Sequence, residues 1–353
     1  MFEELLAAES SWEYFKNTDL PIICYGTGNG ADKILNEFNR LNIKISGFMA
    51  SDGFVRKRKF KDFTVKSLEE CEKEFNQFAV AVCFGSQLPV VINNIKLIAS
   101  RHKTLVPCVA VCGKNIFNKD FLKANIENIE RAYNLLADMK SKDIYYNLLK
   151  FQLGGDLKYL SECESEKSEA LNGVLKLEKC RSYLDLGAYR GDTMEEYLKY
   201  CKNRYNKIIA VEPDKKTFLK LQHNTGQIKN ITLLNVGIWL KKSTVPFFQA
   251  GGRNSGILSS GKSVISSESV DSILQGGSID YIKADIEGAE YEMLDGAKTT
   301  LQSYKPKLNI AAYHRAEDIF RLILKINEIN PEYKIYIRHH PCIPAWDTNL
   351  YCI

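Results

Sequence analysis

Short apolar runs alternate with amphipathic stretches along most of the 353-residue chain. In the first third, four apolar runs are predicted strands, at residues 21–25, 43–49, 78–84 and 105–111. Helical patterns, as at 31–41 and 90–100, lie between them. Strands that alternate with helices favour parallel βαβ units. Residues 1–112 are therefore predicted to form a small Rossmann-like α/β domain.

The pattern changes after this domain. Between residues 117 and 153, apolar residues recur at three- and four-residue steps, which indicates helices. From Gly154 to Lys179 the composition turns to Gly, Ser, Glu and Lys, which is typical of a domain boundary. Residues 113–178 are expected to be a helical connector and linker.

The alternation of strands and helices then restarts in residues 179–353. Seven strands are predicted, at residues 182–186, 207–211, 231–236, 279–284, 307–313, 333–338 and 348–352. The last two are close in sequence, so the pattern predicts a doubly wound sheet that ends in a hairpin. The fold class is α/β in both halves of the chain.

Composition and charge narrow the protein class only a little. Lys and Arg number 48 and Asp and Glu 43, and the net charge of +5 does not by itself indicate a nucleic-acid partner. No run approaches the roughly 18 apolar residues of a membrane helix, and the acidic N-terminus does not resemble a signal peptide. We expect a cytoplasmic protein without a membrane span. The ten cysteines form no C-x-x-C pair and are expected to be buried thiols, not a disulfide framework or a zinc site.

The most informative stretch is YLDLGAYRGDT, residues 183–193. A predicted strand runs into Asp185, a turn holds Gly187, Ala188 and Gly191, and a helix starts near Thr193. This places the turn at the carboxyl edge of the sheet, where α/β proteins bind ligands. Glycines there allow the backbone to approach a ligand closely.

The acids around this turn restrict the ligand. Carboxylates at Asp185 and Asp192 would repel the pyrophosphate of a dinucleotide. S-adenosylmethionine carries no phosphate, and its ammonium, sulfonium and ribose diol all attract carboxylates. Glu212 ends the next strand, where an acid can accept both ribose hydroxyls. The alternative is a generic α/β protein in which an Asp only caps a helix.

Four motifs in order resemble one family. DLGAYRGDT at 185–193, VEPD at 211–214, KADIEGAEYEMLDGA at 283–297 and AYHRAEDI at 312–319 look like those of FkbM-type, class I S-adenosylmethionine-dependent methyltransferases. The resemblance covers residues 180 to 353. It implies O-methyl transfer to a hydroxyl of a sugar or polyketide-type acceptor, on a class I methyltransferase sheet.

The resemblance also implies a set of cofactor-binding residues. Asp185, Gly187, Ala188 and Gly191 would form the cofactor turn, Glu212 would hold the ribose, and residues 235–237 would lie at the adenine. The full set expected to bind S-adenosylmethionine is Asp185, Gly187, Ala188, Gly191, Asp192, Thr193, Glu212, Pro213, Asn235, Val236, Gly237 and Asp285. Leu186 and Tyr189 are expected to be packing residues.

Three acids follow the fourth strand of this domain. If that strand continues through Glu287, then Asp285 and Glu287 project to the same face, and Glu290 returns on the first turn of the next helix. Such carboxylates can orient acceptor hydroxyls and the cofactor's cation, or they can simply sit well at a helix N-terminus. They could also hold a divalent metal. No further Asp-Asp pair accompanies them, so no metal is expected.

Methyl transfer to a hydroxyl needs an in-line approach and removal of a proton. His314 ends an apolar strand at the ligand edge and belongs to a residue type that titrates near neutrality, so it is expected to contact the acceptor or act as the base. Asp285 is the rival base. The catalytic candidates are His314, Asp285 and Glu287.

Further residues could line an acceptor pocket. Arg338, His339 and His340 close the sixth strand and Trp346 opens the last hairpin. An aromatic ring packs on a sugar face, and Arg binds an anionic sugar or phosphate. The alternative is that these are solvated strand-end residues. The acceptor-binding candidates are Glu287, Glu290, His314, Arg338 and Trp346; the Gly-rich loop 249–256 could close over them.

The N-terminal domain has a glycine turn of its own, YGTGNGA at 25–31. Gly26, Gly28 and Ala31 have G-x-G-x-x-A spacing after a strand, and Asp52 stands where a dinucleotide fold places its ribose-binding acid. No carboxylate precedes these glycines, so no charge there would repel a phosphate. The turn could therefore bind NAD or the nucleotide of an activated sugar. The nucleotide-binding candidates are Gly26, Gly28, Gly30 and Asp52. The glycines could also serve the turn alone.

Other functions stay open at this point. Tyr146 and Lys150 have the Y-x-x-x-K spacing of short-chain dehydrogenases, which gives an NAD-dependent oxidoreductase as an alternative. A non-catalytic scaffold is a second alternative. The basic run 56–61 is either a solvated loop or a segment that meets a polyanionic glycan.

We expect an S-adenosylmethionine-dependent O-methyltransferase that acts on a carbohydrate acceptor, either a nucleotide sugar or a surface glycan. Its partners are then small molecules or glycans and not nucleic acid, and a homodimer is compatible with the sequence.

Overall fold

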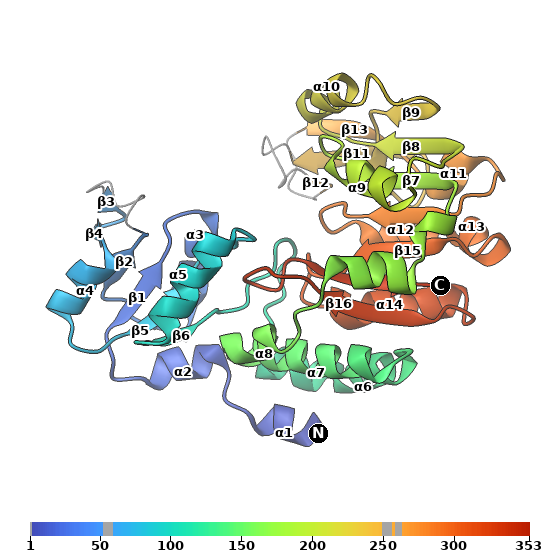
Figure 1. Cartoon of the computed structure of the whole chain (residues 1–353). Helices are drawn as coiled ribbons and strands as arrows, with labels where there is room; N and C mark the ends of the chain where they lie inside the picture. The colour runs from blue at the N-terminus through green and yellow to red at the C-terminus, as the bar shows by residue number, and fades with distance from the viewer. Residues whose placement is uncertain (1, 52–58, 249–255, 258–262) are drawn as a thin grey trace.

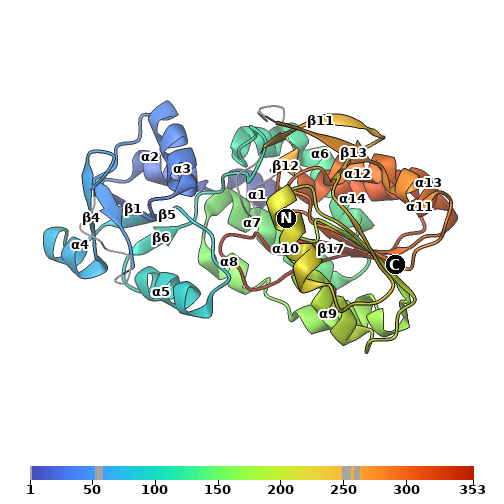
Figure 2. The ribbon, with the colours of Figure 1, turned by 90° about the horizontal axis from the view of Figure 1, so that it is seen from above.

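The computed structural model describes residues 2–51, 59–248, 256–257 and 263–353. Asp52, the first half of the basic run 56–61 and all of the loop 249–256 except Gly256 lie outside the described residues. The chain forms two lobes, each built around one large sheet, with helices α6, α7 and α8 beneath the junction and the C-terminal lobe (Figure 1). The view from above shows the same two lobes side by side (Figure 2).

The N-terminal lobe contains a six-stranded sheet in the order β3-β4-β2-β1-β5-β6, parallel except for β3. Its strands are β1 (Ile22–Tyr25), β2 (Gly47–Met49), β3 (Lys59–Phe60), β4 (Phe63–Lys66), β5 (Ala79–Val82) and β6 (Lys103–Leu105). Its helices are α2 (Ser11–Asn17), α3 (Asn29–Arg40), α4 (Leu68–Glu74) and α5 (Pro89–Ala99). The predicted Rossmann-like alternation is confirmed. The hairpin of β3 and β4 and the helix α4 were not predicted, because none of them has a long apolar run.

The connector is a set of packed helices. It consists of α6 (Lys119–Leu135), α7 (Met139–Gly154) and α8 (Leu157–Ser161), while α1 (Phe2–Ala7) lies against α6. The polar segment that follows is not a loose linker. It forms a π-helix over Glu169–Val174 and a 3₁₀ turn over Leu177–Lys179, and Ala170 and Leu171 are fully buried.

The C-terminal lobe contains the predicted seven-stranded sheet, in the order β16-β17-β15-β14-β7-β8-β9. Its strands are β7 (Ser182–Leu186), β8 (Lys207–Val211), β9 (Ile231–Leu234), β14 (Tyr281–Ala284), β15 (Lys307–Ala311), β16 (Ile335–His339) and β17 (Thr348–Cys352). Only β17 runs antiparallel to its neighbours, which is the predicted terminal hairpin. The strand order reverses between β7 and β14, so a crevice opens at their carboxyl ends.

Helices cover both faces of this sheet. They are α9 (Asp192–Tyr200), α10 (Lys215–Asn224), α11 (Val270–Leu274), α12 (Glu290–Gly296), α13 (Lys298–Ser303) and α14 (Asp318–Ile329). The connector adds to this cover, since α6 packs on α14 and α7 packs on β16.

A second, smaller sheet is inserted between β9 and β14, and the sequence pattern did not predict it. Its strands are β10 (Gly237–Ile238), β11 (Ser243–Phe248), β12 (Gly256–Ile257) and β13 (Ser263–Glu268), in the order β10-β13-β11-β12. Val245 and Phe247 form a small apolar cluster of their own, against which Trp239 and Ile265 pack.

The cysteines and the helix lengths agree with the sequence expectations. All ten cysteines are free thiols, nine of them buried and Cys108 half-buried. No helix among the described residues combines the length and the apolar character that crossing a bilayer requires.

Candidate active site

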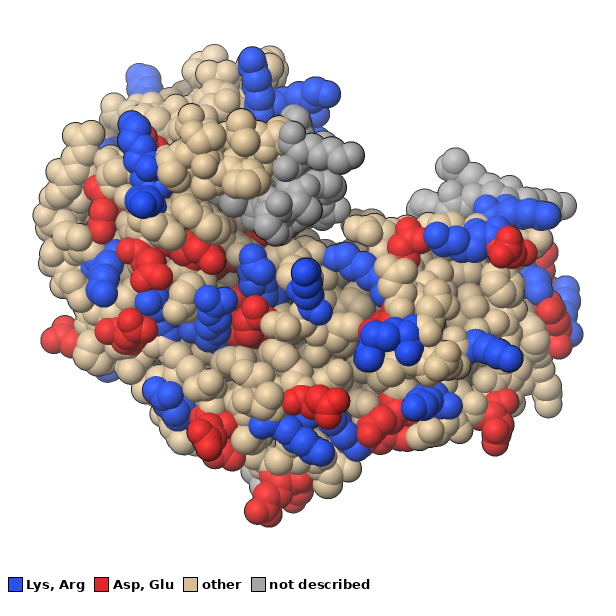
Figure 3. All heavy atoms as spheres, turned by 180° about the vertical axis from the view of Figure 1, so that it is seen from behind, with Lys and Arg blue, Asp and Glu red and all other residues tan. Residues whose placement is uncertain are grey.

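A cleft of about 980 Å³ lies where the two lobes meet. The space-filling view from behind shows the surface hollowed between them (Figure 3). The carboxyl ends of β7, β8, β14 and β15 line it from the C-terminal lobe, and the turns after β1 and β5 line it from the N-terminal lobe. Both sheets therefore direct their ligand-binding edges at one space.

Gly187 sits at the centre of the C-terminal edge. Its φ is +79°, and a Cβ atom there would lie 2.0 Å from the carbonyl oxygen of Asp285. Only glycine fits this close approach of the ends of β7 and β14. The amides of Gly187 and Ala188 both donate to the carbonyl of Val211, each at 3.0 Å, which ties the turn to the end of β8.

Asp185 lies behind this turn. Its carboxylate is fully buried and accepts a 2.6 Å hydrogen bond from the hydroxyl of Thr193, in the first turn of α9. Burial raises the pKa of Asp185, and Lys283, 3.8 Å away, partly offsets this. Asp185 therefore fixes the turn and the start of α9 from below and does not itself line the cleft.

Glu212, at the end of β8, lines the cleft and is only 7% exposed. Its two carboxylate oxygens accept hydrogen bonds from the amides of Tyr189 (3.0 Å) and Asp214 (2.8 Å), which fix its direction. Burial raises the pKa of Glu212 to about 7. New hydroxyl donors at this carboxylate would favour its charged form.

The structure separates the predicted cofactor residues into two groups. The cleft is lined by Gly187, Asp192, Thr193, Glu212, Pro213, Val236, Gly237 and Asp285. Asp185, Ala188, Gly191 and the exposed Asn235 are not part of that lining. Asn235 donates to the carbonyls of Glu212 (2.8 Å) and Pro213 (3.1 Å), so its side chain supports the end of β8.

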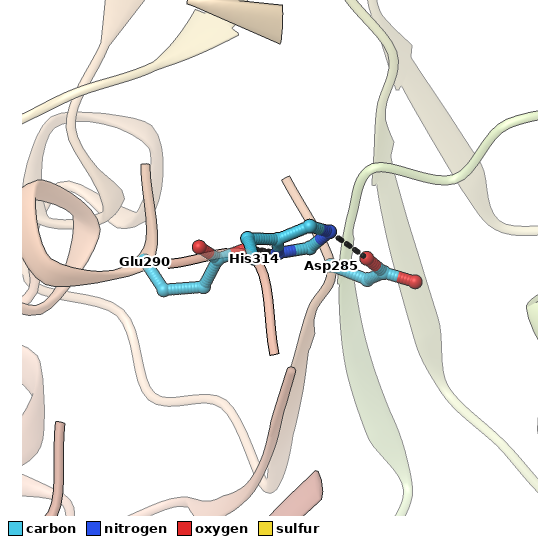
Figure 4. A group of neighbouring side chains, drawn as sticks. All are labelled: Asp285, Glu290 and His314. Atoms are coloured by element: carbon cyan, nitrogen blue, oxygen red, sulfur yellow. Dashed lines mark ion pairs between the residues drawn. The ribbon is translucent and has the colours of Figure 1, made fainter. Parts of the chain in front are cut away.

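The acids after β14 surround one histidine (Figure 4). His314 Nε2 lies 3.4 Å from Asp285 Oδ1 and 3.6 Å from Glu287 Oε2. On the other side of the ring, Nδ1 lies 3.0 Å from Glu290 Oε1. The predicted continuation of the strand through Glu287 is wrong, because β14 ends at Ala284 and Glu287 has a left-handed φ of +55°. The acids come together through the turn and His314 instead.

These neighbours decide the protonation of the cluster. Burial lowers the pKa of His314, but Glu290, Glu287 and Asp285 outweigh burial and raise it to about 10. Burial also raises the pKa of Glu287 to about 7, against the opposing effect of His314. The expectation that His314 titrates near neutrality is therefore wrong. At neutral pH it is an imidazolium, which cannot accept a proton, whereas Glu287 titrates near neutrality.

Glu290 holds His314 from behind. It is 1% exposed, begins α12, and accepts a 2.9 Å hydrogen bond from the amide of Ile286. It does not line the cleft, so the expected direct contact with the acceptor is corrected to a supporting position.

Two residues at Asp285 were not predicted as site residues. Tyr313 donates its hydroxyl to Asp285 Oδ1 at 3.2 Å, and Lys283 Nζ lies 3.9 Å from Asp285 Oδ2. Lys283 is 8% exposed, yet it lines the cleft. A lone cation on an apolar strand, two positions from an acid, is a signal that could have identified it.

The same acids could in principle share a metal ion. In the part of the chain that the structure describes, Asp285, Glu290 and His314 offer one ligand atom each, all within 4.8 Å of one another. Two positive groups already face these acids, since His314 is protonated and Lys283 lies beside Asp285.

Of the two residues of the last hairpin that were expected to bind the acceptor, one lines the cleft and the other does not. Trp346 is half-buried and lines the cleft. Arg338 is 2% exposed and turned toward the connector, where it contacts Asp138 at 2.9 Å and Glu169 at 3.3 Å. Its predicted contact with the acceptor is wrong, because both partners lie outside the cleft. The buried His339 and His340 do not line the cleft either. His339 forms a hydrogen bond with Thr348, and His340 forms hydrogen bonds with Ser165 and Tyr351.

In the N-terminal lobe, Gly28 and Gly30 line the same cleft and Gly26 lies just behind them. The Y-x-x-x-K pair has no part in it. Lys150 Nζ lies over the ring of Tyr146 at 4.4 Å, on α7, and both residues line a separate cavity next to α1. The pair forms a cation–π contact outside the cleft.

Residues 185–334 match the family model of the methyltransferase FkbM domain. These residues form an FkbM methyltransferase domain. The chain is thus an S-adenosylmethionine-dependent methyltransferase, as the four motifs implied. The FkbM domain spans the cofactor turn, Glu212, the acids after β14 and His314.

The whole chain also resembles a solved structure of the FkbM type. The crystal structure of a methyltransferase FkbM from Methylobacillus flagellatus KT is 20% identical, with a TM-score of 0.72, and the match covers 99% of this chain and 92% of that one. At this identity the likeness concerns the fold, including the N-terminal lobe. No curated protein matches the chain.

Two further likenesses are confined to about half of the chain. A putative methyltransferase from Streptococcus mutans in complex with SAH is 12% identical over 53% of this chain and 97% of that one, with a TM-score of 0.35. Aeropyrum pernix fibrillarin, in complex with S-adenosyl-L-methionine, is 14% identical over 50% and 68%, with a TM-score of 0.33. Both scores are too low to support any functional argument.

Proposed function

We propose that the protein transfers a methyl group from S-adenosylmethionine to a hydroxyl of a carbohydrate acceptor, with Glu287 as the general base. The carrying observation is the position of Glu287. It lines the cleft, it lies 3.6 Å from the His314 imidazolium, and its pKa is about 7. A base whose pKa lies near the working pH combines availability with driving force.

The residues at the C-terminal edge suit the cofactor. Carboxylates of Glu212, Asp192 and Asp285 line this part of the cleft, a set that would repel a phosphate and attract a cation. We assign Glu212 to the ribose hydroxyls, Asp285 and Asp192 to the ammonium end, and the backbone at Val236 and Gly237 to the adenine. When bound, the cofactor supplies an electrophilic methyl group on a sulfonium centre.

The other two catalytic candidates position Glu287 and the acceptor. His314 is already protonated and holds Glu287 and Asp285 through its charge. Asp285 accepts a hydrogen bond from Tyr313 and faces Lys283, and these contacts fix the direction of its carboxylate. A carboxylate held in this way can accept a hydrogen bond from an acceptor hydroxyl and orient it.

A carbohydrate fits the rest of the cleft. Trp346 presents an aromatic ring, and Asp285 and Glu287 present two hydroxyl-binding carboxylates in the same cleft. Aromatic faces and carboxylates together suit the apolar face and the hydroxyls of a sugar. We infer that no metal is needed, since Lys283 and His314 balance the acids, and the rate should survive treatment with a chelator.

The test is product identification with a cofactor whose methyl group carries ¹³C. The protein is incubated with this cofactor and a panel of nucleotide sugars and free glycans, and each product is examined by mass spectrometry and NMR. A methyl ether on a sugar carbon supports the proposal. A labelled methyl on nitrogen, carbon or a non-carbohydrate acceptor would replace it.

A further inference from the structure

The N-terminal lobe contributes one wall of the cleft, and its chemistry differs from that of the opposite wall. Among the described residues, the N-terminal lining contains no carboxylate and one cation, Lys33. The opposite lining contains twice as many carboxylates as cations. Its carboxylates are those of Asp192, Glu196, Glu212, Asp285, Glu287 and Asp347, and its cations are Lys167, Lys283 and the protonated His314. A ligand that lies across the cleft therefore meets an excess of acids at one end and a lysine with uncharged groups at the other.

This wall is the place where the N-terminal sheet itself would bind a ligand. The strand order reverses between β1 and β5, and the cleft lining includes the turn after β1, at Gly28–Gly30, and the turn after β5, at Cys83–Leu88. In doubly wound sheets ligands bind in the crevice at such a reversal. Here that crevice opens into the methyltransferase cleft.

The three glycines after β1 each do something different. Gly26 has a φ of +112°, which makes the tight turn, and a Cβ atom at Gly30 would lie 2.2 Å from the carbonyl oxygen of Cys83, so α3 packs closely on β5. Gly28 faces open space, and a Cβ atom there would meet no atom within 4 Å. This division into turn, open approach and close packing is that of a turn that accepts a pyrophosphate.

The two ends of the cleft are joined by a short fixed segment. Lys33 Nζ donates to the carbonyls of Ala110 (2.9 Å) and Val111 (2.6 Å), and the next amide, of Cys112, donates to the carbonyl of His314 at 2.9 Å. Three residues of chain span at most about 10 Å. The cation of one wall is thus held at a set, short distance from the catalytic cluster of the other.

We propose that the acceptor carries a diphosphate, which binds against Gly28 and Lys33 of the N-terminal lobe while its sugar hydroxyl reaches Glu287. This deepens the proposed function and rests on it. The acids of the C-terminal wall would repel the diphosphate, so the charges fix the direction in which the acceptor enters. Nucleoside diphosphate sugars and lipid-linked diphosphate sugars share this chemistry.

A pair of variants at Gly28 tests the site. Gly28 precedes α3 with a φ of −103°, a conformation open to any residue, and Asp and Asn are equally good at that position. Gly28→Asp places a carboxylate in the open space, while Gly28→Asn places a neutral side chain of the same size there. Both variants should fold and bind S-adenosylhomocysteine like the unchanged protein.

The probes are inorganic pyrophosphate, the diphosphates of the common nucleosides, one undecaprenyl-diphosphate sugar in detergent, and NAD, each titrated by calorimetry. We expect one diphosphate to bind, Gly28→Asp to weaken it by about 30-fold or more, and Gly28→Asn to weaken it by no more than about 5-fold. Comparing the nucleoside diphosphates with the undecaprenyl-diphosphate sugar shows which of the two kinds of diphosphate the protein binds. Equal losses in both variants, binding of NAD alone, or no binding by any probe would overturn the proposal.

The readouts keep the two proposals separate. If S-adenosylhomocysteine binds and a neutral sugar is methylated while no diphosphate binds, the inference about the N-terminal wall fails and the methyltransferase proposal stands. If a diphosphate binds and responds to Gly28→Asp but no sugar diphosphate is methylated on oxygen, the wall binds its ligand and the proposed function fails.

Discussion

Glu287 Oε2 lies 3.6 Å from His314 Nε2, and this contact assigns the two residues opposite tasks. The carboxylates around His314 hold it as an imidazolium, whereas burial raises the pKa of Glu287 into the physiological range. Glu287 therefore has the pKa that is typical of a general base. His314 is permanently charged at neutral pH and supports Glu287.

The rate should depend on pH through Glu287. The folded-state pKa of Glu287 is about 7, so the carboxylate is lost as the pH falls through that value. We expect kcat/KM for the acceptor to fall about tenfold per unit below pH 7 and to level off above it. Steady-state rates in overlapping buffers measure this. A profile that rises as the pH falls from 8 to 6 would argue against a carboxylate base.

Glu212 should carry much of the cofactor affinity. Glu212→Gln keeps the size of the side chain but removes the charge that accepts the ribose hydroxyls, so affinity for S-adenosylhomocysteine should fall by about 10- to 100-fold in calorimetry. Glu195→Gln, at an exposed acid on α9, is the matched control and should bind as the unchanged protein does. Equal affinities in both variants would remove Glu212 from the cofactor site.

Gly187 should tolerate no side chain. Gly187→Ala combines a φ of +79° with a Cβ atom 2.0 Å from the Asp285 carbonyl oxygen, so we expect a loss of more than about 2 kcal/mol in the free energy of unfolding. Gly173→Ala, where a Cβ atom would meet nothing within 4 Å, is the control and should change stability by less than about 1 kcal/mol. Urea titrations compare the two. A stable Gly187→Ala protein would show that the turn adopts another conformation.

Arg338 should support the fold and not the acceptor. Arg338→Met removes the ion pairs with Asp138 and Glu169 and the hydrogen bond to Ser141. Both acids are partly exposed and Glu169 keeps Lys140, so the protein should be destabilised by only about 1–2 kcal/mol. The KM for the acceptor should stay the same at a temperature where the variant is folded. A raised KM with unchanged stability would return Arg338 to the acceptor pocket.

The strands of the C-terminal sheet could be predicted because each is an apolar run bounded by polar turns. β7, β8 and β17 begin and end where the sequence indicated. The inserted sheet was missed, since β11 and β13 mix serines with apolar residues and bury little. Weakly buried strands leave a weak periodic signal.

For the site, the sequence indicated which residues gather but not which way each one faces. Asp285, Glu287 and His314 come from two adjacent strand ends, which the topology predicts. The burial of Arg338 could not be predicted, because its ion-pair partners come from the connector, far away in the chain. Nor could the pKa of His314, which depends on Glu290 approaching from behind at 3.0 Å.

The most direct test of the account is single-turnover methyl transfer by Glu287→Gln. The amide keeps the size of the side chain and one acceptor oxygen but cannot take a proton, so the rate should fall by about 100-fold or more. Binding of S-adenosylhomocysteine should stay within about threefold of the unchanged protein. A Glu287→Gln protein that transfers the methyl group at the full rate would contradict the assignment of Glu287 as the base.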